Sequence, residues 1–308
     1  MKILITGGAG FIGSNIADAL LAKEHDVIVF DNLSSGKKEN VDKKAKFYKA
    51  NIYNKKEVDR IFKKEKPQIV IHHAAQIDVR KSVEDPFFDA QVNILGSINV
   101  LNACVENKVK KIIFASSGGS VYGECKALSP KEDAKTNPVS PYAIAKNSVE
   151  NYINFYSVVH GLDYTILRYG NVYGPRQDPH GEAGVVAIFT GRMFKNEEVL
   201  VFGDGKQMRD YVYAGDVVNA NLKSLTKGKN QVINIGTGEA VSVNELVKVI
   251  SKSIGYKKKA VHKPKRDGEL FKSFLNINKA KTVLFWTPKV NMEQGIKLTV
   301  DYLKREYK

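Results

Sequence analysis

Tyr142 and Lys146 are the two side chains whose types and spacing point most directly to chemistry. On a helix, a spacing of four residues places both side chains on one face. A tyrosine phenol ordinarily ionises at about pH 10. A neighbouring ammonium, together with a positively charged cofactor ring, favours the phenolate and lowers the pKa of Tyr142. We therefore expect the pair to act at neutral pH, with Tyr142 as the general base.

A glycine-rich segment at residues 7–13 follows a short apolar run and opens a helical pattern. Its glycines permit a tight turn, close approach of the backbone to a pyrophosphate and close packing of helix on sheet. The N–H groups at the start of the helix would bind that diphosphate. Asp31 ends the next apolar run, where a carboxylate can accept both ribose hydroxyls and repel a 2′-phosphate. We expect NAD rather than NADP, the plainer alternative being that Asp31 only caps a turn.

These residues must be positioned by regular elements, and the chain alternates short apolar runs with amphipathic stretches. The pattern predicts strands at 3–5, 27–30, 47–50, 69–72, 111–115, 164–168 and 231–236, and helices at 12–21, 55–64, 86–107, 140–160 and 243–254. Strands separated by helices form βαβ units, whose right-handed crossovers build a parallel sheet covered on both faces. We therefore expect an α/β fold with a doubly wound parallel sheet, the Rossmann arrangement.

After Tyr169 this regular alternation ends, and glycines, prolines and aromatic residues interrupt the elements. We expect a smaller C-terminal α/β substrate domain there. The expected division is 1–167 plus roughly 211–238 for the cofactor domain, and 168–210 plus 239–308 for the substrate domain. Residues 257–266 are expected to form a basic linker.

The chain has 308 residues, 43% of them hydrophobic, so it can bury a substantial core. Its 48 Lys and Arg against 33 Asp and Glu give a formal charge of +15. Such a charge can attract nucleic acid or a small anionic ligand. The lysines are scattered in short clusters, however, so we interpret them as surface decoration and expect no nucleic-acid partner.

Cys104 and Cys125 are the only cysteines, which excludes a disulfide framework and favours a cytoplasmic location. His72 and His73 are neighbours on a predicted strand and should face opposite ways, so we expect no metal site. No apolar stretch approaches the roughly 18 residues of a membrane span. The first apolar run is also too short for a signal peptide, so we expect neither leader nor membrane association.

With these motifs in order, the chain resembles the extended short-chain dehydrogenase/reductases, and most closely the UDP-glucose/UDP-N-acetylglucosamine 4-epimerases. The resemblance covers nearly the whole length. It rests on residues 7–13, 31–33, 74–76, 82–86, 93, 116–123, 142–146, 168–176, 202–205, 209–212, 234–236 and 266–269.

The resemblance implies NAD-dependent inversion at C4 of a UDP-hexose through a transient 4-keto sugar. Tyr142 would remove the O4 proton while the C4 hydride goes to the nicotinamide, and the hydride would return to the other face of the turned sugar. Arg209 and Arg266 match the diphosphate-binding arginines of the family, and Asn171 matches a substrate contact. The alternative for each of these three residues is an ordinary surface salt bridge with no role in substrate binding.

The resemblance also implies the cofactor contacts. These are Gly7, Gly10, Phe11, Ile12, Gly13, Asp31, Asn32, Ser35, Gly36, Asn51, Ile52, Ala74, Ala75, Gln76, Asn93, Tyr142, Lys146 and Tyr169. Asn51 departs from the family, which generally has Asp beside the adenine. An amide both accepts and donates hydrogen bonds, so we expect NAD binding to survive.

A second departure is Gly118, which stands where the family usually has the Ser or Thr that hydrogen-bonds the sugar O4. Ser117 resembles the catalytic hydroxyl of a Ser/Thr-Gly-Gly subgroup, with Ser116 and Ser120 as alternatives. On an extended strand Ser116 and Ser117 point in opposite directions, so only one is expected to reach the sugar. We favour Ser117.

The residue that closes the sugar pocket in the family matches Ser273, with Phe274 as the result of an alignment slip of one residue. A bulky residue there excludes an N-acetyl group, whereas a small one admits it. We therefore expect UDP-GlcNAc and UDP-GalNAc as substrates, and UDP-Glc and UDP-Gal as well.

Three other possibilities need comparison. A 4,6-dehydratase needs an Asp-Glu pair where this chain has Gly118 and Gly119. A UDP-glucuronate 4-epimerase, or another nucleotide-sugar enzyme of the superfamily, needs a cation for the sugar carboxylate, which the sequence leaves open. A non-catalytic NAD- or RNA-binding scaffold on the same fold is the alternative of another class. By resemblance, the helices at 86–107 and 141–160 would pair across a homodimer.

Overall fold

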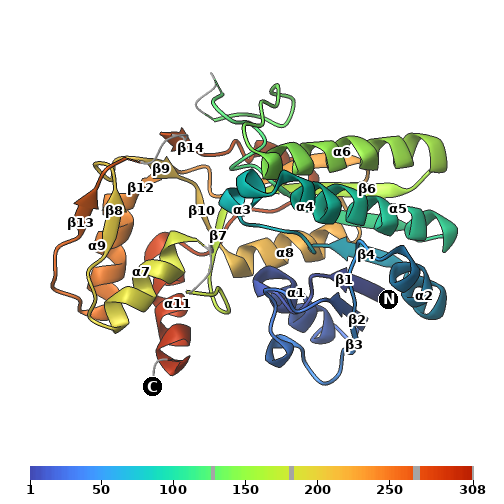
Figure 1. The fold of residues 1–308 in the computed structure, drawn as a ribbon, viewed down its shortest axis with the longest axis horizontal. Coiled ribbons are helices and arrows are strands. Elements are labelled where there is room, and N and C mark those ends of the chain that lie inside the picture. Colours follow the sequence, from blue (N-terminus) through green and yellow to red (C-terminus); the bar gives the residue numbers. More distant parts are fainter. Residues whose placement is uncertain (126–128, 180–183, 266–270, 307–308) are drawn as a thin grey trace.

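A computed structural model describes residues 1–125, 129–179, 184–265 and 271–306. Its main feature is a seven-stranded sheet in the order β11-β6-β5-β4-β1-β2-β3, in which every neighbouring pair is parallel (Figure 1). The strands are β1 Lys2–Thr6, β2 Asp26–Asp31, β3 Lys46–Lys49, β4 Ile69–His72, β5 Lys111–Ser117, β6 Asp163–Tyr169 and β11 Gln231–Ile235. The predicted doubly wound sheet is confirmed.

Helices cover both faces of this sheet (Figure 1). The helices α1 Phe11–Leu21 and α8 Ala214–Ser224 pack on one face, and α2 Lys55–Glu65, α5 Gly96–Glu106 and α6 Pro141–His160 on the other. Successive residues of β1 therefore enter different cores: Ile3 and Ile5 belong to one apolar cluster, and Leu4 to the other. Burial on both faces explains why the strands are apolar runs without alternation.

The predicted helix at 86–107 is continuous but not uniform. It comprises α4 Pro86–Ala90, a π-helical segment Gln91–Leu95 and α5, and its start is capped by Asp85, whose carboxylate accepts from the Phe88 N–H. A π-helical turn inside a helix often accompanies a functional site. Here it carries Asn93. In the described part of the chain, several helices were not predicted: the short α3 Val79–Glu84, α10 Asn278–Val283 and a 3₁₀ turn Lys38–Asn40, and the longer α7 Val185–Phe194, α8 and α11 Met292–Glu306.

A separate apolar cluster joins α7 Val185–Phe194, α9 Val243–Ile254 and α11 Met292–Glu306. Its small sheets pair β7 Asn171–Tyr173 with β10 Tyr211–Tyr213, β8 Leu200–Phe202 with β13 Val261–Lys263, and β9 Met208–Arg209 with β12 Val241–Ser242 and β14 Lys272–Ser273. We propose that this cluster is the core of the smaller, substrate-binding domain.

The expectation of a basic linker at 257–266 is wrong for its middle part. Val261–Lys263 forms β13, in parallel register with β8. Lysine-rich composition does not prevent pairing, because backbone groups make the ladder while His262 and Lys263 remain exposed to water. The last residue of that stretch, Arg266, lies outside the described residues.

The helix α6 carries both side chains of the predicted catalytic pair. Ser140 caps its start by accepting a hydrogen bond from the Ala143 N–H, and Pro141 occupies the first helical position. Gly161, with φ of 70°, ends it. These local signals place Tyr142 and Lys146 in the first two turns. Within the described part of the chain, no helix is long and apolar enough to cross a membrane.

Candidate active site

The predicted site residues gather where the parallel strands end at their carboxyl edge. The glycine segment 7–13 follows β1, Asp31 ends β2, Ala74–Gln76 follow β4, Ser117 ends β5 and Tyr169 ends β6. In doubly wound sheets this edge is where ligands bind. The topology therefore brings together residues that are far apart in the sequence.

The glycine segment has the shape of a diphosphate cradle. Gly7 has φ of +71°, and a Cβ there would lie 2.6 Å from the Ala74 nitrogen, so the position excludes side chains. A Cβ on Gly13 would collide with the Gly7 carbonyl. Gly10 precedes α1 without any side-chain cap. The first-turn N–H groups of Phe11 and Ile12 therefore have no capping side chain, which suits a bound phosphate.

Asp31 is buried and connects β2 to the glycine segment. Its Oδ2 accepts from the Ala9 N–H at 3.0 Å, and its Oδ1 accepts from the Leu33 N–H at 2.8 Å. Asp31 therefore caps the turn that follows β2, as the alternative interpretation proposed, and also supports the glycine segment. Each carboxylate oxygen can accept more than one hydrogen bond, so Asp31 retains capacity for ribose hydroxyls.

Several further residues predicted to contact NAD follow β2 and β3, Asn51 among them as the residue expected beside the adenine. The Asn32 amide donates to Asn51 Oδ1 at 2.6 Å, which leaves the Asn51 amide group to serve as a donor. Ile52 is buried beside Gly96. Gly36 packs against Ala9. Ser35, also predicted as a contact, is exposed next to Gly36.

A polar network fixes the segment that follows β4, where Ala75 is half-buried. The Gln76 backbone N–H donates to Asn93 Oδ1 at 2.8 Å, and Asn93 Nδ2 donates back to the Gln76 carbonyl at 2.9 Å. Both amides also donate to Asp89 Oδ1, each at 2.9 Å. Asp89 is 1% exposed, and its other oxygen has no hydrogen-bond partner. The sequence analysis named Gln76 and Asn93 as cofactor contacts but did not name this carboxylate.

His72 ends β4 and His73 follows it, and their side chains face opposite ways, as expected. The His72 ring lies between Thr6 and Ser97, with contacts of 2.6 and 2.9 Å. The His73 ring stacks on Tyr169, with ring centroids 5.9 Å apart. Burial lowers the pKa of both histidines to about 3, so both are neutral. Asn221 donates to the Tyr169 hydroxyl at 2.9 Å, which holds that ring in place.

Tyr142 and Lys146 lie on one face of α6, as predicted. Lys146 Nζ lies 5.8 Å from the centroid of the Tyr142 ring and donates to the Ala115 carbonyl at 2.9 Å. Burial lowers the pKa of Lys146 to about 8, although Asp89 and Glu150 oppose the shift. Burial raises the pKa of Tyr142 to about 12, against a hydrogen bond with Ser117. The expected lowering of the Tyr142 pKa is therefore wrong for the protein groups by themselves.

The two serines at the end of β5 point in opposite directions, and their roles separate. Ser116 donates to Oε1 of Glu150, a residue of α6, at 2.5 Å. Ser117 shares a hydrogen bond with the Tyr142 hydroxyl and lies 2.7 Å from Ser120 Oγ. The geometry thus directs Ser117, rather than Ser116, toward the phenol.

Gly118, the residue that departs from the family, has a packing explanation. A Cβ there would lie 2.7 Å from Leu275 Cδ1 and 3.2 Å from the Arg168 carbonyl. Leu275 belongs to a small apolar cluster with Val121 and Tyr122. The space that a family Ser or Thr would occupy is therefore filled from a distant part of the chain.

Asn171 and Arg209 line one pocket of about 360 Å³ beside the apolar cluster that joins α7, α9 and α11. Asp210 organises this wall: its carbonyl accepts from the Asn171 N–H at 2.7 Å, and its backbone N–H donates to the Ser273 carbonyl. Ser273 pairs directly with Arg209 in the β14–β9 register. Sequence reasoning missed Arg80, Arg192, Phe202 and Gln207, which also line the pocket.

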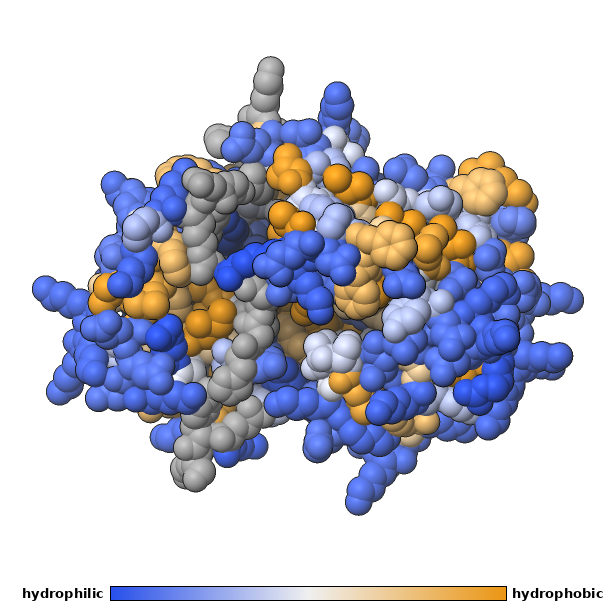
Figure 2. All heavy atoms as spheres, in the orientation of Figure 1, coloured by the Kyte–Doolittle hydropathy of each residue, from blue (hydrophilic) through white to orange (hydrophobic). Residues whose placement is uncertain are grey.

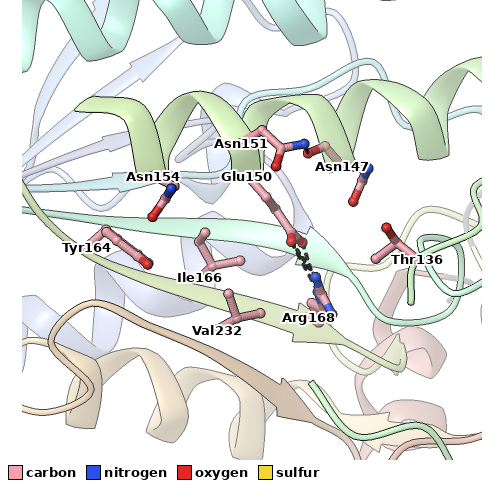
Figure 3. A pocket seen from close by; sticks show the side chains of 9 residues that line it. All are labelled: Thr136, Asn147, Glu150, Asn151, Asn154, Tyr164, Ile166, Arg168 and Val232. Carbon is pink, nitrogen blue, oxygen red and sulfur yellow. Dashed lines mark hydrogen bonds and ion pairs between the residues drawn. The ribbon is translucent and has the colours of Figure 1, made fainter. Parts of the chain in front are cut away.

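A second pocket, of about 260 Å³, lies between α6 and the β6–β11 edge of the sheet (Figure 3). Glu150 and Arg168 point toward each other there and form a buried ion pair at 2.6 Å. Arg168 also donates to the Tyr122 hydroxyl. This pocket includes none of the predicted site residues. The ion pair between Glu150 and Arg168 joins α6 to β6.

A glycine segment of the dinucleotide-binding type after β1, with a Tyr–Lys pair on α6 and a chain that continues into a second core, defines an extended short-chain dehydrogenase/reductase. The family model for the NAD-dependent epimerase/dehydratase family matches residues 3–236. The chain belongs to this family, and its cofactor is NAD.

Three solved structures are similar over almost the whole chain. The UDP-glucose 4-epimerase of Thermotoga maritima with UDP-glucose is 51% identical, with a TM-score of 0.99 and 100% of both chains covered. That of Thermus thermophilus in complex with NAD is 44% identical, with a TM-score of 0.95 and 99% of both chains covered. A UDP-N-acetylglucosamine 4-epimerase from Methanobrevibacter ruminantium is 34% identical, with a TM-score of 0.94 over 99% of this chain and 98% of its own.

Proposed function

We propose that the protein inverts C4 of a UDP-hexose through a transient 4-keto sugar. The observation that carries this proposal is the contact of Ser117 with the Tyr142 hydroxyl, in the same group of strand ends as the diphosphate cradle. The pocket with Asn171 and Arg209 supplies a place for the nucleotide. The relatives named as UDP-sugar 4-epimerases support the same conclusion.

Bound NAD supplies the acceptor and donor of the C4 hydride. Tyr142 takes the O4 proton as that hydride leaves, and returns it to O4 when the hydride comes back to the opposite face. Ser117 hydrogen-bonds O4 and keeps it beside the phenol. Lys146 and the positive nicotinamide ring together favour the phenolate, which the protein groups by themselves do not.

Inversion requires a firm hold on the diphosphate and a loose hold on the sugar. Arg209 is suited to the diphosphate because a guanidinium offers paired donors to phosphate oxygens. Arg266 would add a second guanidinium. The Gly118 and Gly119 backbone beside Ser117 has no side chains that could hydrogen-bond the sugar hydroxyls. The Leu275 side chain that fills the space beside Gly118 is apolar as well, so this wall offers a turning 4-keto sugar no side-chain hydrogen bond.

The proposed substrates are UDP-GlcNAc and UDP-GalNAc, together with UDP-Glc and UDP-Gal. The small Ser273 side chain is half-buried beside Arg209, which favours space for an acetamido group. An NMR time course with UDP-Glc, UDP-GlcNAc, UDP-glucuronate and their 4-epimers tests this. Interconversion of the first two pairs is expected. A 4-keto-6-deoxy product, or turnover of UDP-glucuronate alone, would overturn the proposal.

We also propose a homodimer that acts in the cytoplasm. Figure 2 shows apolar side chains gathered over the region of α4 and α6. Phe87, Leu95, Ile144, Phe155 and Val159 are exposed there, between 49% and 79%. Both cysteines are free, which suits a reducing compartment. Light scattering should give twice the chain mass, and Phe155→Asp should give a monomer. A wild-type monomer would reject the dimer.

A further inference from the structure

Tyr169 connects the cofactor side of the sheet edge with the turn that follows Ser117. It ends β6, and its carbonyl accepts from the Gly118 N–H at 2.8 Å and from the Gly119 N–H at 3.3 Å. Its side chain is buried and reaches α8, on the face of the sheet opposite to α6. The backbone of Tyr169 therefore holds the turn beside the proposed catalytic hydroxyl, while its ring lies on the other side of the sheet edge.

The Tyr169 ring stacks on the ring of His73. The two ring centroids lie 5.9 Å apart, with 29° between the ring planes. The His73 backbone borders the glycine segment, since a Cβ on Gly7 would lie 2.8 Å from its carbonyl carbon. Burial and, after it, the charge of Lys146 lower the pKa of His73. The stack is therefore next to both the diphosphate cradle and the Tyr142–Lys146 pair, which is where a hydride acceptor has to lie.

Asn221, a residue of α8, holds both rings of this stack. It is fully buried, and its Nδ2 donates to the Tyr169 hydroxyl and to the Val217 carbonyl, each at 2.9 Å. A hydrogen bond between Asn221 and His73 opposes the lowering of the His73 pKa. Val217 and Ala220 beside it belong to the apolar cluster on that face of the sheet. A buried amide is tolerated only when it is hydrogen-bonded, so Asn221 and the two rings fix one another.

The absence of charge on the Asn221 amide suits this place. The nicotinamide ring is positively charged in NAD and neutral in NADH, so a charged side chain beside it would favour one of the two states. The pKa of His73 is about 3, which keeps the stack neutral as well. A neutral support suits a cofactor that takes up a hydride and then returns it.

We propose that Asn221 is a positioning residue for the cofactor: it fixes the Tyr169 hydroxyl and the His73 ring, and so holds the stack against which the nicotinamide ring packs. The family resemblance assigned Tyr169 to the cofactor, but neither His73 nor any residue of α8. The NAD cofactor alone is enough for this role, and only its effect on turnover rests on the proposed function.

Displacement of bound NAD from the holoprotein by ADP-ribose tests this role. ADP-ribose lacks the nicotinamide but shares the rest of NAD, so the concentration that displaces half of the NAD reports the nicotinamide contribution. Asn221→Leu removes the hydrogen bonds at similar volume. It should lower that concentration roughly 3- to 10-fold, the range for loss of a neutral hydrogen bond. General damage to the cradle would weaken both ligands alike and leave the concentration unchanged.

Ser224→Ala is the matched control. Ser224 is also fully buried on α8, but its hydroxyl donates to the Ala220 carbonyl of its own helix. This variant should be displaced like the wild type. Tyr169→Phe removes the hydrogen bond with Asn221 from its other side and should also lower the ADP-ribose concentration. Adding Asn221→Leu to Tyr169→Phe should then lower it by less than Asn221→Leu does in the wild type.

Three results would overturn the assignment: an unchanged ADP-ribose concentration in Asn221→Leu, an equal change in Ser224→Ala, or fully additive effects of Asn221→Leu and Tyr169→Phe. If Asn221→Leu yields no folded protein, an unchanged concentration in Tyr169→Phe would reject the assignment.

Turnover provides a second readout. Asn221→Leu should lower kcat and leave the KM for the UDP-sugar nearly unchanged. More NADH should remain on the protein, because the 4-keto sugar leaves before the hydride returns to it. If the wild type turns over no UDP-sugar while the displacement shifts as expected, the proposed function fails and the role of Asn221 stands. Normal turnover with an unchanged displacement rejects only the role of Asn221.

Discussion

The ammonium of Lys146 is hydrogen-bonded to the Ala115 carbonyl at 2.9 Å, so it joins α6 to β5 as well as placing a charge near Tyr142. Its distance of 5.8 Å from the phenol ring centroid allows an electrostatic effect without direct proton transfer between the two. The protein groups hold the pKa of Tyr142 at about 12. In the proposed mechanism, Tyr142 therefore reaches its phenolate form at neutral pH only with the charge that the cofactor brings, which couples proton removal to hydride transfer.

Tyr142→Phe should retain the fold and bound NAD, because the ring still packs and only the hydroxyl is lost. Turnover should fall roughly 10²–10⁴-fold, the usual contribution of general acid–base catalysis. Steady-state kinetics and the NAD content of the purified protein are the measurements. Near-normal turnover would mean that another group removes the proton.

Ser117→Ala should be clearly less active than the wild type, because it removes the hydroxyl beside the Tyr142 phenol. Ser120→Ala should be milder. Ser116→Ala should also be milder in turnover, but it should lower the melting temperature, since buried Glu150 loses a donor. Kinetics and thermal melts on the three variants separate these roles. A silent Ser117→Ala would contradict the assignment around Gly118.

Asp89→Asn should move the pH–rate profile to lower pH. The Lys146 pKa of about 8 is held up against burial by Asp89 and Glu150, while His72 and His73 nearby are neutral. Loss of the Asp89 charge lowers the pKa values of both Lys146 and Tyr142, so both limbs of the profile shift downward. Asparagine keeps an oxygen for the Gln76 and Asn93 amides.

The matched control for this carboxylate is Glu84→Gln, an exposed change on α3 that should leave the profile in place. The measurement is kcat against pH for the wild type and both variants. An unchanged profile in Asp89→Asn, or a shift of the same size in Glu84→Gln, would show that Asp89 acts only as a structural acceptor.

Asp31→Ala should reduce the preference for NAD over NADP, because the repulsion of a 2′-phosphate is removed. It should also weaken NAD binding itself, since the carboxylate supports the glycine segment through the Ala9 N–H. Cofactor titrations with NAD and NADP measure both effects. Purification of the wild type with bound NADP would reject the role given to Asp31.

Ser273→Tyr should abolish turnover of UDP-GlcNAc and spare UDP-Glc. The bulky ring would fill space beside Arg209, and an acetamido group cannot be compressed to fit. Phe274→Tyr, which adds only a hydroxyl at the neighbouring position, is the control. Progress curves with the two sugars are compared. Intact UDP-GlcNAc turnover in Ser273→Tyr would place the gate elsewhere.

The sequence by itself determined the doubly wound sheet, the glycine segment at its first turn and the shared face of Tyr142 and Lys146. These features follow from hydrophobic periodicity, turn-forming residues and helix capping, each of which acts over a few residues. Gly7, for example, adopts a positive φ, and Ser140 and Pro141 start α6. The π-helical turn at Asn93 and the pairing within the basic stretch were missed, because each depends on contacts outside its own segment.

Only the tertiary structure decided which serine faces the phenol and why position 118 is glycine. The alternation of side chains along a strand predicts that Ser116 and Ser117 point to opposite faces. Which serine points to which face follows from the hydrogen bond of Ser116 with Glu150 on α6. Leu275, more than half the chain away from Gly118, fills the space beside that glycine. The high pKa of Tyr142 and the hydrogen bond of Asn221 with Tyr169 have the same origin. Burial and cross-chain contacts arise only when segments distant in sequence pack together, so no local pattern records them.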